Sequence, residues 1–388
     1  MVQFGGQTAI NLSQSLDHVG RPVIGSSAKT IDTASNREHF NELMESLGIP
    51  QPPGATITTL NEALSVAERL GFPLLVRPSY VLGGRAMEIV SNNMELEQYI
   101  SAATEISEGR PILIDKYLEG REVEVDAISD GEAILIPGIM EHVERAGVHS
   151  GDSMAIYPDL TLTQTEVELL VDYTSRMARG LGVKGLMNVQ FIVMKDSPGN
   201  EPLVKSREYS SSIYVIEVNP RASRTIPFIS KVTGIPMVDL ATRVMLGETI
   251  KGLGYEKSLA PKRNLVGVKA PVFSMSKLAG VDTYLGPEMK STGEVMGIDF
   301  DLRPAMAKAL LAGNLMLPPK GSILLSIADK DKVESLSLVK DLHRVGYKIF
   351  ATEGTAAVIN AIGIKATVIE KKLGEGHTKV VDILVNGT

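Results

Sequence analysis

The sequence contains no cysteine, and this absence excludes several kinds of chemistry at once. Without thiols the chain cannot form disulfides, use a catalytic thiolate, or bind zinc or an iron–sulfur cluster through cysteine. It also lacks an apolar run long enough to span a membrane, and its first residues lack the basic-then-apolar pattern of a signal peptide. The net charge of −7 argues against a general nucleic-acid binder. We therefore expect a cytoplasmic protein whose partners include neither a membrane nor a nucleic acid.

The length of 388 residues suits two or three domains, and a composition of 44% hydrophobic and 22% charged residues is ordinary for a globular protein. Residues 1–27 predict a βαβ unit, with strands at 2–4 and 22–25, that is too small to close a core alone. The sequence begins inside the first of these strands and stops where an α/β unit should continue. We therefore expect a piece of a longer protein.

The stretch 214–221 carries the first functional signal. It predicts a short strand that ends at its proline, because proline cannot donate to a sheet ladder. Side chains alternate along a strand, so Glu217 and Asn219 should share one face while Ile216 and Val218 share the other. A carboxylate and an amide oxygen, followed by an arginine, suit a hard cation and the phosphates that it bridges. The alternative is a half-buried edge strand with solvated polar residues.

A second strand, predicted at Gly185–Val193, strengthens the first signal. Residues 195–212, between the two strands, are polar and rich in serine, glycine and proline, so the strands should form an antiparallel hairpin. Asn188 and Gln190 share a face of this strand, and Gln190 can lie across from Glu217. The pairing predicts that the Gln190 and Glu217 side chains converge on one divalent cation.

A glycine-rich loop at 78–85 lies between strands predicted at 72–77 and 86–90. Strand, loop and strand form a hairpin and not the strand–loop–helix of a Walker P-loop. The glycines let the backbone approach a phosphate closely, but a plain hairpin turn would use them too.

Two further polar segments have the composition of a ligand site. Residues 122–127 alternate acidic and apolar residues and predict a half-exposed strand, with Glu124 and Asp126 interpreted as solvent-facing. Glu122 is the better candidate to accept a ribose hydroxyl. The loop at 141–153 has two histidines seven residues apart, which matches no common metal spacing, so we expect it to donate hydrogen bonds to a ligand.

The remainder of the chain predicts a second kind of domain. Residues 221–319 are mixed and mostly helical, with one strand at 265–272, and residues 317–321 are typical of a linker. Strands and helices then alternate, which predicts a parallel sheet with covering helices. Residues 352–355 lie between a strand's carboxyl end and a helix's amino end, where anions bind, although an ordinary N-cap explains them equally well.

Together these motifs resemble the second ATP-grasp half of the large subunit of carbamoyl phosphate synthetase. Four stretches carry the resemblance in order: 77–87, 147–153, 187–191 and 217–221. The resemblance implies an α/β (α+β) ATP-grasp fold in four parts. These are a partial pre-ATP-grasp domain at 1–27, an ATP-grasp core at 28–235, a C-terminal ATP-grasp strand with a helical connection at 236–319, and an incomplete parallel-sheet regulatory domain similar to methylglyoxal synthase at 320–388.

The resemblance also implies the ligands, ATP with Mg²⁺ or Mn²⁺, and a role for each site residue. The nucleotide phosphates would be bound by Arg37, Arg77, Gly83 and Gly84. Lys116 and Leu118 would hold the adenine mainly through backbone groups, Glu122 would bind the ribose, and the loop of Gly147, Val148, His149 and Ser150 would close on the nucleotide. The metal would be held by Gln190, Glu217 and Asn219. Asn219, Arg221 and Arg224 would be catalytic, with the arginines facing the acceptor and the transferring phosphoryl group. In the regulatory domain, the effector positions would be Lys332, Thr352, Thr355 and Lys371.

The activity implied by the resemblance is the ATP-dependent phosphorylation of carbamate to carbamoyl phosphate, by a ligase of pyrimidine and arginine biosynthesis. Such a transfer needs charge neutralisation and alignment more than a covalent nucleophile. The implied partners are the missing half of the synthetase and a glutaminase small subunit, and a homo-oligomer is allowed. The alternatives are a non-catalytic nucleotide-binding or assembly module that needs the missing half, and a different ATP-grasp ligase such as a biotin-dependent carboxylase, which the string at 77–87 disfavours.

Overall fold

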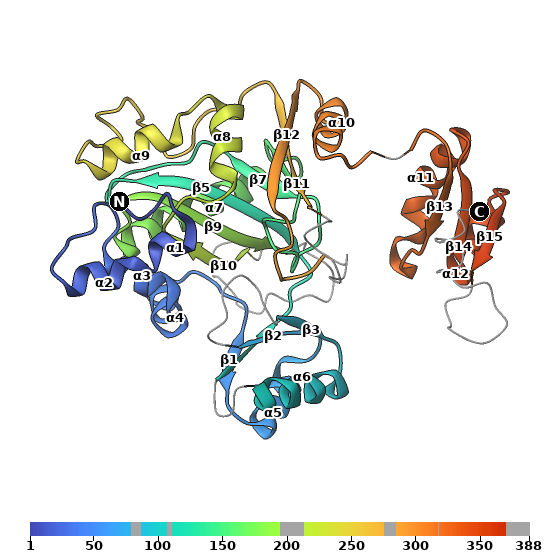
Figure 1. Ribbon diagram of the computed structural model, residues 1–388, viewed down its shortest axis with the longest axis horizontal. Helices are drawn as coiled ribbons and strands as arrows, with labels where there is room; N and C mark the ends of the chain where they lie inside the picture. Colours follow the sequence, from blue (N-terminus) through green and yellow to red (C-terminus); the bar gives the residue numbers. More distant parts are fainter. Residues whose placement is uncertain (79–86, 107–110, 195–212, 275–284, 317, 370–388) are drawn as a thin grey trace. The chain divides into compact units, whose positions relative to one another are not determined.

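The structure, a computed structural model, describes residues 1–78, 87–106, 111–194, 213–274, 285–316 and 318–369 (Figure 1). The chain divides into two compact units, Met1–Leu315 and Met316–Thr388. The larger unit contains a four-stranded and an eight-stranded sheet, and the smaller unit contains a three-stranded sheet. The predicted mixed α/β class is confirmed, whereas the four-part domain division stays a prediction.

The small sheet of the larger unit is antiparallel, in the order β1-β4-β2-β3. Its strands are β1 (Gly54–Ile57), β2 (Leu74–Pro78), β3 (Glu88–Val90) and β4 (Ile112–Lys116), and the helices α5 (Leu60–Leu70) and α6 (Asn93–Ile106) pack on it. A capping box of Thr59 and Glu62 opens α5, because each residue's side chain accepts from the other's backbone N–H. Strands β2 and β3 form the predicted hairpin, and its glycine loop lies outside the described residues.

The large sheet is also antiparallel, in the order β10-β9-β5-β7-β8-β11-β12, with β6 paired to β5. Its strands are β5 (Arg121–Ser129), β6 (Ile134–Leu135), β7 (Ile139–His142), β8 (Ala155–Tyr157), β9 (Gly185–Val193), β10 (Ile213–Asn219), β11 (Val266–Val272) and β12 (Gly293–Asp299). The predicted antiparallel pairing of β9 with β10 is confirmed.

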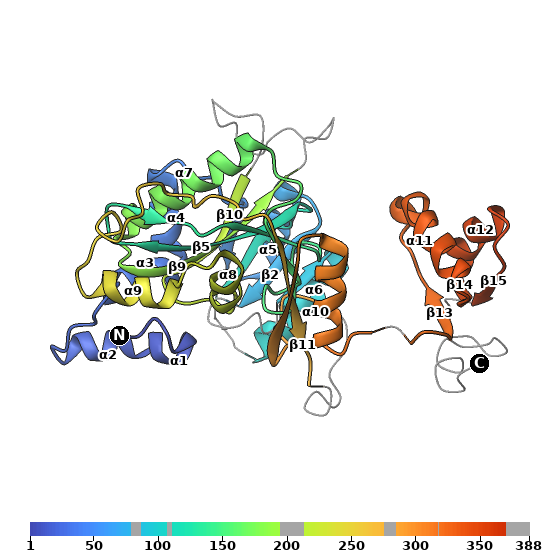
Figure 2. The same cartoon turned by 90° about the horizontal axis from the view of Figure 1, so that it is seen from above.

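Helices cover both faces of this sheet. On one face, α4 (Arg37–Ser46) and α7 (Gln164–Leu181) pack on the apolar side chains of β5 and β9. On the other face lie α8 (Thr225–Thr233) and α9 (Met237–Met245), as Figure 2 shows. Because of this second layer, β5 is buried along almost its whole length. The alternation predicted for residues 122–127 is correct, but the half-exposed strand is wrong.

Strand β12 was missed at the sequence level because it contains two glycines. Helix α10 (Leu302–Ala312) packs on β11 and β12, and its backbone comes so close to Gly297 that an added Cβ would lie 2.1 Å from the Ala305 carbonyl oxygen. Only glycine allows this approach. A residue that usually weakens a strand therefore permits the packing of this one.

The first 27 residues contain helices but no strand. They form α1 (Gly6–Ile10) and α2 (Leu12–His18), followed by α3 (Ala28–Ser35). The strands predicted at 2–4 and 22–25 are wrong, because no strand among the described residues pairs with either segment. Instead, the buried Gln3 side chain donates to Ser26 Oγ and the Lys184 carbonyl, and accepts from the Leu186 N–H, which fixes the segment to β9.

The smaller unit has the predicted parallel sheet. Strands β13 (Ser322–Leu325), β14 (Lys348–Thr352) and β15 (Ala366–Ile369) pair in that order. The short 3₁₀ helix η2 (Asp329–Asp331), α11 (Lys332–Arg344) and α12 (Glu353–Ala361) connect them, and residues from α11 and α12 join the sheet in one core.

Candidate functional site

Two rows of polar side chains cross one face of the large sheet over the neighbouring strands β10, β9 and β5. In the first row Gln190 lies opposite Glu217 and Glu124, and in the second Asn188 lies opposite Asn219 and Asp126. Residues directly opposite in an antiparallel pair point to the same face. The β10 end of the rows is open, since Glu217 is exposed and Asn219 half-buried, whereas the β5 end is buried.

A bulge in β10 brings Glu217 to this face. The register against β9 shifts between Val215 and Glu217. Val215 and Val218 both lie in the core on the opposite face, so strict alternation from Val215 would have put Glu217 there too. The extra residue, Ile216, packs in a separate apolar cluster. Glu217 and Asn219 do share a face, as predicted, but the predicted grouping of Ile216 with Val218 is wrong.

The open end of the rows presents oxygen atoms. Gln190 Nε2 donates to Ser150 Oγ over 2.7 Å, and Asn219 Nδ2 donates to Glu217 Oε1 over 2.5 Å. Because each amide nitrogen is engaged, each amide oxygen is directed to the other side of its group. Among the described residues no group of three or more His, Asp or Glu side chains is arranged to hold a metal, so a cation here would need amide as well as carboxylate ligands.

The buried end is a hydrogen-bonded network that the sequence did not reveal. Asn188 Nδ2 donates to Glu124 Oε1 and Asp126 Oδ1 at 2.7 and 2.8 Å. Thr225 Oγ1 lies 3.0 Å from Glu124 Oε1 and 2.6 Å from Asp126 Oδ2, and Ser223 Oγ donates to Asp126 Oδ1. The prediction that Glu124 and Asp126 face solvent is therefore wrong. They are hydrogen-bonded to Asn188 of β9 and Thr225 of α8, and so link β5 to a neighbouring strand and to a covering helix.

Burial and neighbouring charges, including the repulsion between the two acids, shift the pKa values of Glu124 and Asp126 in opposite directions. Burial, followed by the charge of Glu124, raises the pKa of Asp126 to about 7. Burial also acts to raise the pKa of Glu124, but His142 and the buried Lys269 more than offset it and the pKa is lowered. At neutral pH, therefore, the charge of the pair resides mainly on Glu124.

Glu122 also lies in β5, two residues before Glu124, and belongs to neither polar row. Burial raises its pKa to about 7, and His142 opposes that shift. His142 lies between two acids, with Nδ1 3.5 Å from Glu122 Oε1 and Nε2 3.1 Å from Glu124 Oε2. Burial lowers the pKa of His142, but the two carboxylates outweigh burial and raise it. Glu122 is thus buried beside an imidazole whose protonated form the two acids favour.

The two arginines predicted to bind phosphates come together on one carboxylate. Arg37 Nη2, from α4, lies 2.8 Å from Asp115 Oδ1, and Arg77 Nη2, from β2, lies 4.0 Å from Asp115 Oδ2. Burial lowers the pKa of Arg77, and Asp115 acts in the opposite direction. Asp115 was missed, although a charged residue inside the apolar strand Ile112–Lys116 was a signal. Gly83 and Gly84 lie outside the described residues.

The segment after β4 brings backbone and apolar groups to the site. Lys116 directs its ammonium to the Gly71 and Phe72 carbonyls at 3.1 and 2.9 Å, and the Tyr117 hydroxyl donates to the Ala146 carbonyl at 2.5 Å. Leu118 is buried in an apolar cluster with residues of β9 and β10, which lies next to the polar rows. This arrangement leaves backbone groups and an apolar surface as the contacts that the segment can offer a base.

The loop 143–153, which contains Gly147, Val148, His149 and Ser150, is held from several sides. Lys269 Nζ, buried on β11, donates to the Ser150 carbonyl at 2.9 Å. His149 accepts the Gly151 N–H at Nδ1, and burial lowers the pKa of His149. Gly147 has φ +89°, a conformation that favours glycine. Lys269 was missed, and its charge within the apolar strand β11 was the only signal.

Arg221 and Arg224 follow β10 directly. Arg221 Nη1 donates to the Ala222 carbonyl at 3.1 Å, and burial lowers its pKa while the charge of Glu217 opposes that shift. Arg224 is the residue before α8, and its Nη1 donates to Ser291 Oγ at 3.0 Å. The structure thus places both arginines at the end of the strand that carries Glu217 and Asn219.

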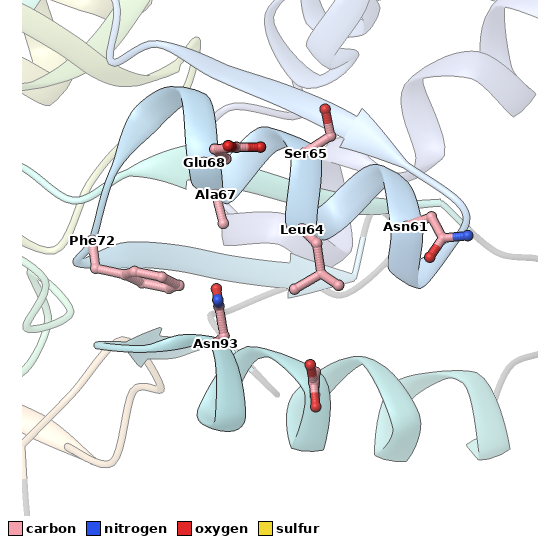
Figure 3. A pocket seen from close by; sticks show the side chains of 8 residues that line it. Asn61, Leu64, Ser65, Ala67, Glu68, Phe72 and Asn93 are labelled. Carbon is pink, nitrogen blue, oxygen red and sulfur yellow. The ribbon is translucent and has the colours of Figure 1, made fainter.

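A cleft of about 650 Å³ lies elsewhere, between α5 and α6 of the small sheet (Figure 3). Its lining includes Asn61, Leu64, Glu68, Phe72 and Asn93. None of the predicted site residues lines it, so it is separate from the polar rows.

In the smaller unit, two predicted effector positions meet at the start of α12. Thr352 Oγ1 lies 3.3 Å from Thr355 Oγ1, which also accepts the Ile327 N–H at 3.1 Å. Lys332 pairs with Asp329, and a Cβ built on Gly354 would lie 2.7 Å from the Lys332 ammonium. Lys371 lies outside the described residues. The effector role stays a prediction.

Solved structures share this fold. The biotin carboxylase of Campylobacter jejuni aligns with a TM-score of 0.59 at 18% identity over 79% of this chain and 72% of that chain. The synthetase purK aligns with a TM-score of 0.59 at 13% identity over 79% of this chain and 77% of that chain. These likenesses concern the fold alone, and they identify it as ATP-grasp.

The sequence comparisons are more specific. The family described as carbamoyl-phosphate synthase L chain, ATP binding domain, matches residues 36–253, and the MGS-like domain matches residues 334–388. The chain therefore belongs to the family of carbamoyl-phosphate synthase L chain ATP-binding domains. The carbamoyl phosphate synthase large chain of Thermomicrobium roseum is 51% identical over 385 residues, which are 99% of this chain. This chain spans 34% of that relative's length. No described helix is long and apolar enough to cross a membrane.

Proposed function

We propose that this chain catalyses metal-dependent phosphoryl transfer from ATP to carbamate, giving carbamoyl phosphate and ADP. In this step a carbamate oxygen forms a bond to the γ-phosphorus, and the bond from that phosphorus to the β,γ-bridging oxygen breaks. The observation that carries the proposal is the register of β9 and β10, which sets Gln190 opposite Glu217 with Asn219 on the same face. Family membership supports the nucleotide, and the relative from T. roseum supports the acceptor.

The oxygens at the open end fit a hard cation. Glu217 is exposed, and the amide nitrogens of Gln190 and Asn219 are engaged, so three oxygen ligands are available on one face. Gln190, Glu217 and Asn219 would hold Mg²⁺ or Mn²⁺. When bound, the ion would neutralise charge on the nucleotide phosphates.

The other site residues would bind and orient the substrates. Arg37 and Arg77, which converge on Asp115, would hold the phosphates of ATP, and Glu122 would accept a ribose hydroxyl. The apolar cluster around Leu118 would lie against the adenine. Arg224, which has exposed surface beyond its contact with Ser291, would bind the acceptor. The loop 143–153 would exclude water from the reacting groups.

The reverse reaction provides the test. The purified chain is incubated with carbamoyl phosphate and MgADP, and ATP formation is measured. We expect Glu217→Ala to lower the rate by about 10²-fold, as losing one electrostatic contact in the transition state commonly does. The Mg²⁺ concentration for half-maximal rate should rise in the same variant. Glu256→Ala, which removes an exposed acid elsewhere, serves as the control. An unchanged rate and Mg²⁺ dependence in Glu217→Ala would contradict the proposed metal role.

A second candidate follows from the share of the relative that the chain spans, which is 34%. The chain would then bind ATP without turnover and act as a nucleotide-binding or assembly module with the remaining parts of a synthetase, including a glutaminase small subunit. Binding of ATP with no ATP synthesis from carbamoyl phosphate and ADP would favour this candidate. Turnover by the isolated chain would exclude it.

A further inference from the structure

The guanidinium of Arg224 is hydrogen-bonded to one buried serine, Ser291. Its Nη1 donates to both oxygens of Ser291, at 3.0 Å to Oγ and 3.4 Å to the carbonyl. Ser291 is 67 residues away in sequence, on the segment that precedes β12, and is 5% exposed. Arg224 itself is exposed. A free arginine would lose several rotamers when it binds a ligand, and an anchored one loses fewer.

Ser291 is held in turn by a buried carboxylate. Asp152, with no exposed surface, accepts the backbone N–H of Lys290 at Oδ2 and that of Ser291 at Oδ1, both at 2.8 Å. The Ser291 hydroxyl donates to the Gly151 carbonyl at 2.8 Å, which directs its lone pairs to Arg224. One hydroxyl is therefore a donor to the loop 143–153 and an acceptor for Arg224.

The loop that supplies Asp152 also reaches the candidate metal ligands. Its Ser150 hydroxyl accepts from Gln190, which lies opposite Glu217, and its His149 N–H donates to the Gly286 carbonyl. One side of the loop thus contacts the proposed metal face and the other holds the segment 286–291. If the loop 143–153 lies over the nucleotide, its bonds to Ser291 also determine the position of Arg224.

We infer that Ser291 is a positioning residue that sets the Arg224 guanidinium for the anionic acceptor, and that Asp152 fixes Ser291 by binding two consecutive backbone N–H groups. The inference rests on the proposed function, because it assigns to Ser291 a part in binding the carbamoyl group. Ser291 does not touch the substrate; it acts through Arg224.

The experiment compares Ser291→Ala with Ser274→Ala in ATP synthesis from carbamoyl phosphate and MgADP. Ser274 is the matched control, because its hydroxyl contacts Thr292, the neighbour of Ser291. We expect Ser291→Ala to raise KM for carbamoyl phosphate about tenfold, because that is the change expected when one hydrogen bond to a charged group is lost. KM for MgADP should be unchanged. Ser291→Thr, which keeps the hydroxyl, should restore KM. Equal changes in both KM values, or none, would overturn the inference.

A double-mutant cycle separates positioning from a structural effect. In the Arg224→Ala background, Ser291→Ala should have no further effect on KM for carbamoyl phosphate, because the residue acts through the lost guanidinium. An additive effect would mean that Ser291 acts independently of Arg224 and would refute the inference.

Binding measurements test the role of Ser291 separately from the proposed function. The wild-type chain and the same variants are titrated with carbamoyl phosphate in the presence of MgADP by calorimetry. A wild-type chain without turnover would refute the proposed function, yet a selective tenfold weakening of carbamoyl phosphate binding in Ser291→Ala would still support the inference. Failure of the wild-type chain to bind carbamoyl phosphate would refute both.

Discussion

The buried acid Asp126 predicts an unusual pH dependence of stability. Its pKa is raised to about 7 in the folded chain, from the ordinary value of 3.8, by burial and by the charge of Glu124. The folded state thus binds the proton more tightly than the unfolded state, so this group stabilises the fold at low pH and the stabilisation is lost as pH rises from about 4 to about 7. Between pH 5 and pH 8 the loss should be about 2–3 kcal/mol, at 1.36 kcal/mol for each pKa unit.

The variant Asp126→Asn should remove this loss. Its amide oxygen can still accept from Asn188 and Ser223, and its amide nitrogen can donate to Thr225, so the network is kept while the titration disappears. From pH 5 to pH 8, the unfolding free energy of the wild type should therefore fall by about 2–3 kcal/mol more than that of the variant.

Urea unfolding at the two pH values measures the effect, read by a brief hydrogen-exchange pulse on peptides from β5 and β9 so that the larger unit alone is followed. Glu132→Gln, which changes an exposed acid in the turn after β5, is the control and should leave the pH dependence as in wild type. Identical pH dependences for wild type and Asp126→Asn would refute the reasoning.

Two further predictions concern packing and buried charge. Gly297→Ala should lower the unfolding free energy by about 1–3 kcal/mol, because its Cβ would meet the backbone of α10, whereas Gly293→Ala in the same strand meets nothing within 4 Å and should change it by less than about 0.5 kcal/mol. Lys269→Met should cost about 3–5 kcal/mol, since it removes a buried cation that, together with His142, lowers the pKa of the buried Glu124, whereas Lys308→Met removes an exposed ammonium that contacts Asp299 and the Ile298 carbonyl and should cost less than about 1 kcal/mol. Thermal and urea unfolding of each pair would test both, and equal losses within either pair would contradict the explanation.

Local patterns were sufficient for most elements of the fold. Capping boxes open α5 at Thr59 and α7 at Thr163, and both bonds of such a box lie within one helical turn, so local sequence is sufficient to form them. The alternation of strands and helices after 321 predicted the parallel sheet. Strand β12 was missed because it contains two glycines, and the reason for one of them, Gly297, is the close packing of α10, which only the folded chain shows.

The sequence by itself determined which chemical groups the candidate site contains. Acid and amide residues at alternate positions of two strands predicted oxygen ligands, and the four family stretches predicted the ATP-grasp fold, because both depend on local order along the chain.

The tertiary structure decided which of those groups are open and which are buried. It put Glu217 on the polar face through a bulge, covered Glu124 and Asp126 with α8, and brought Ser291 to Arg224. The physical reason is that alternation says which side chains share a face but not whether another layer covers that face. Strand register, a bulge and contacts between distant loops depend on residues far apart in sequence, so they exist only once the chain has folded.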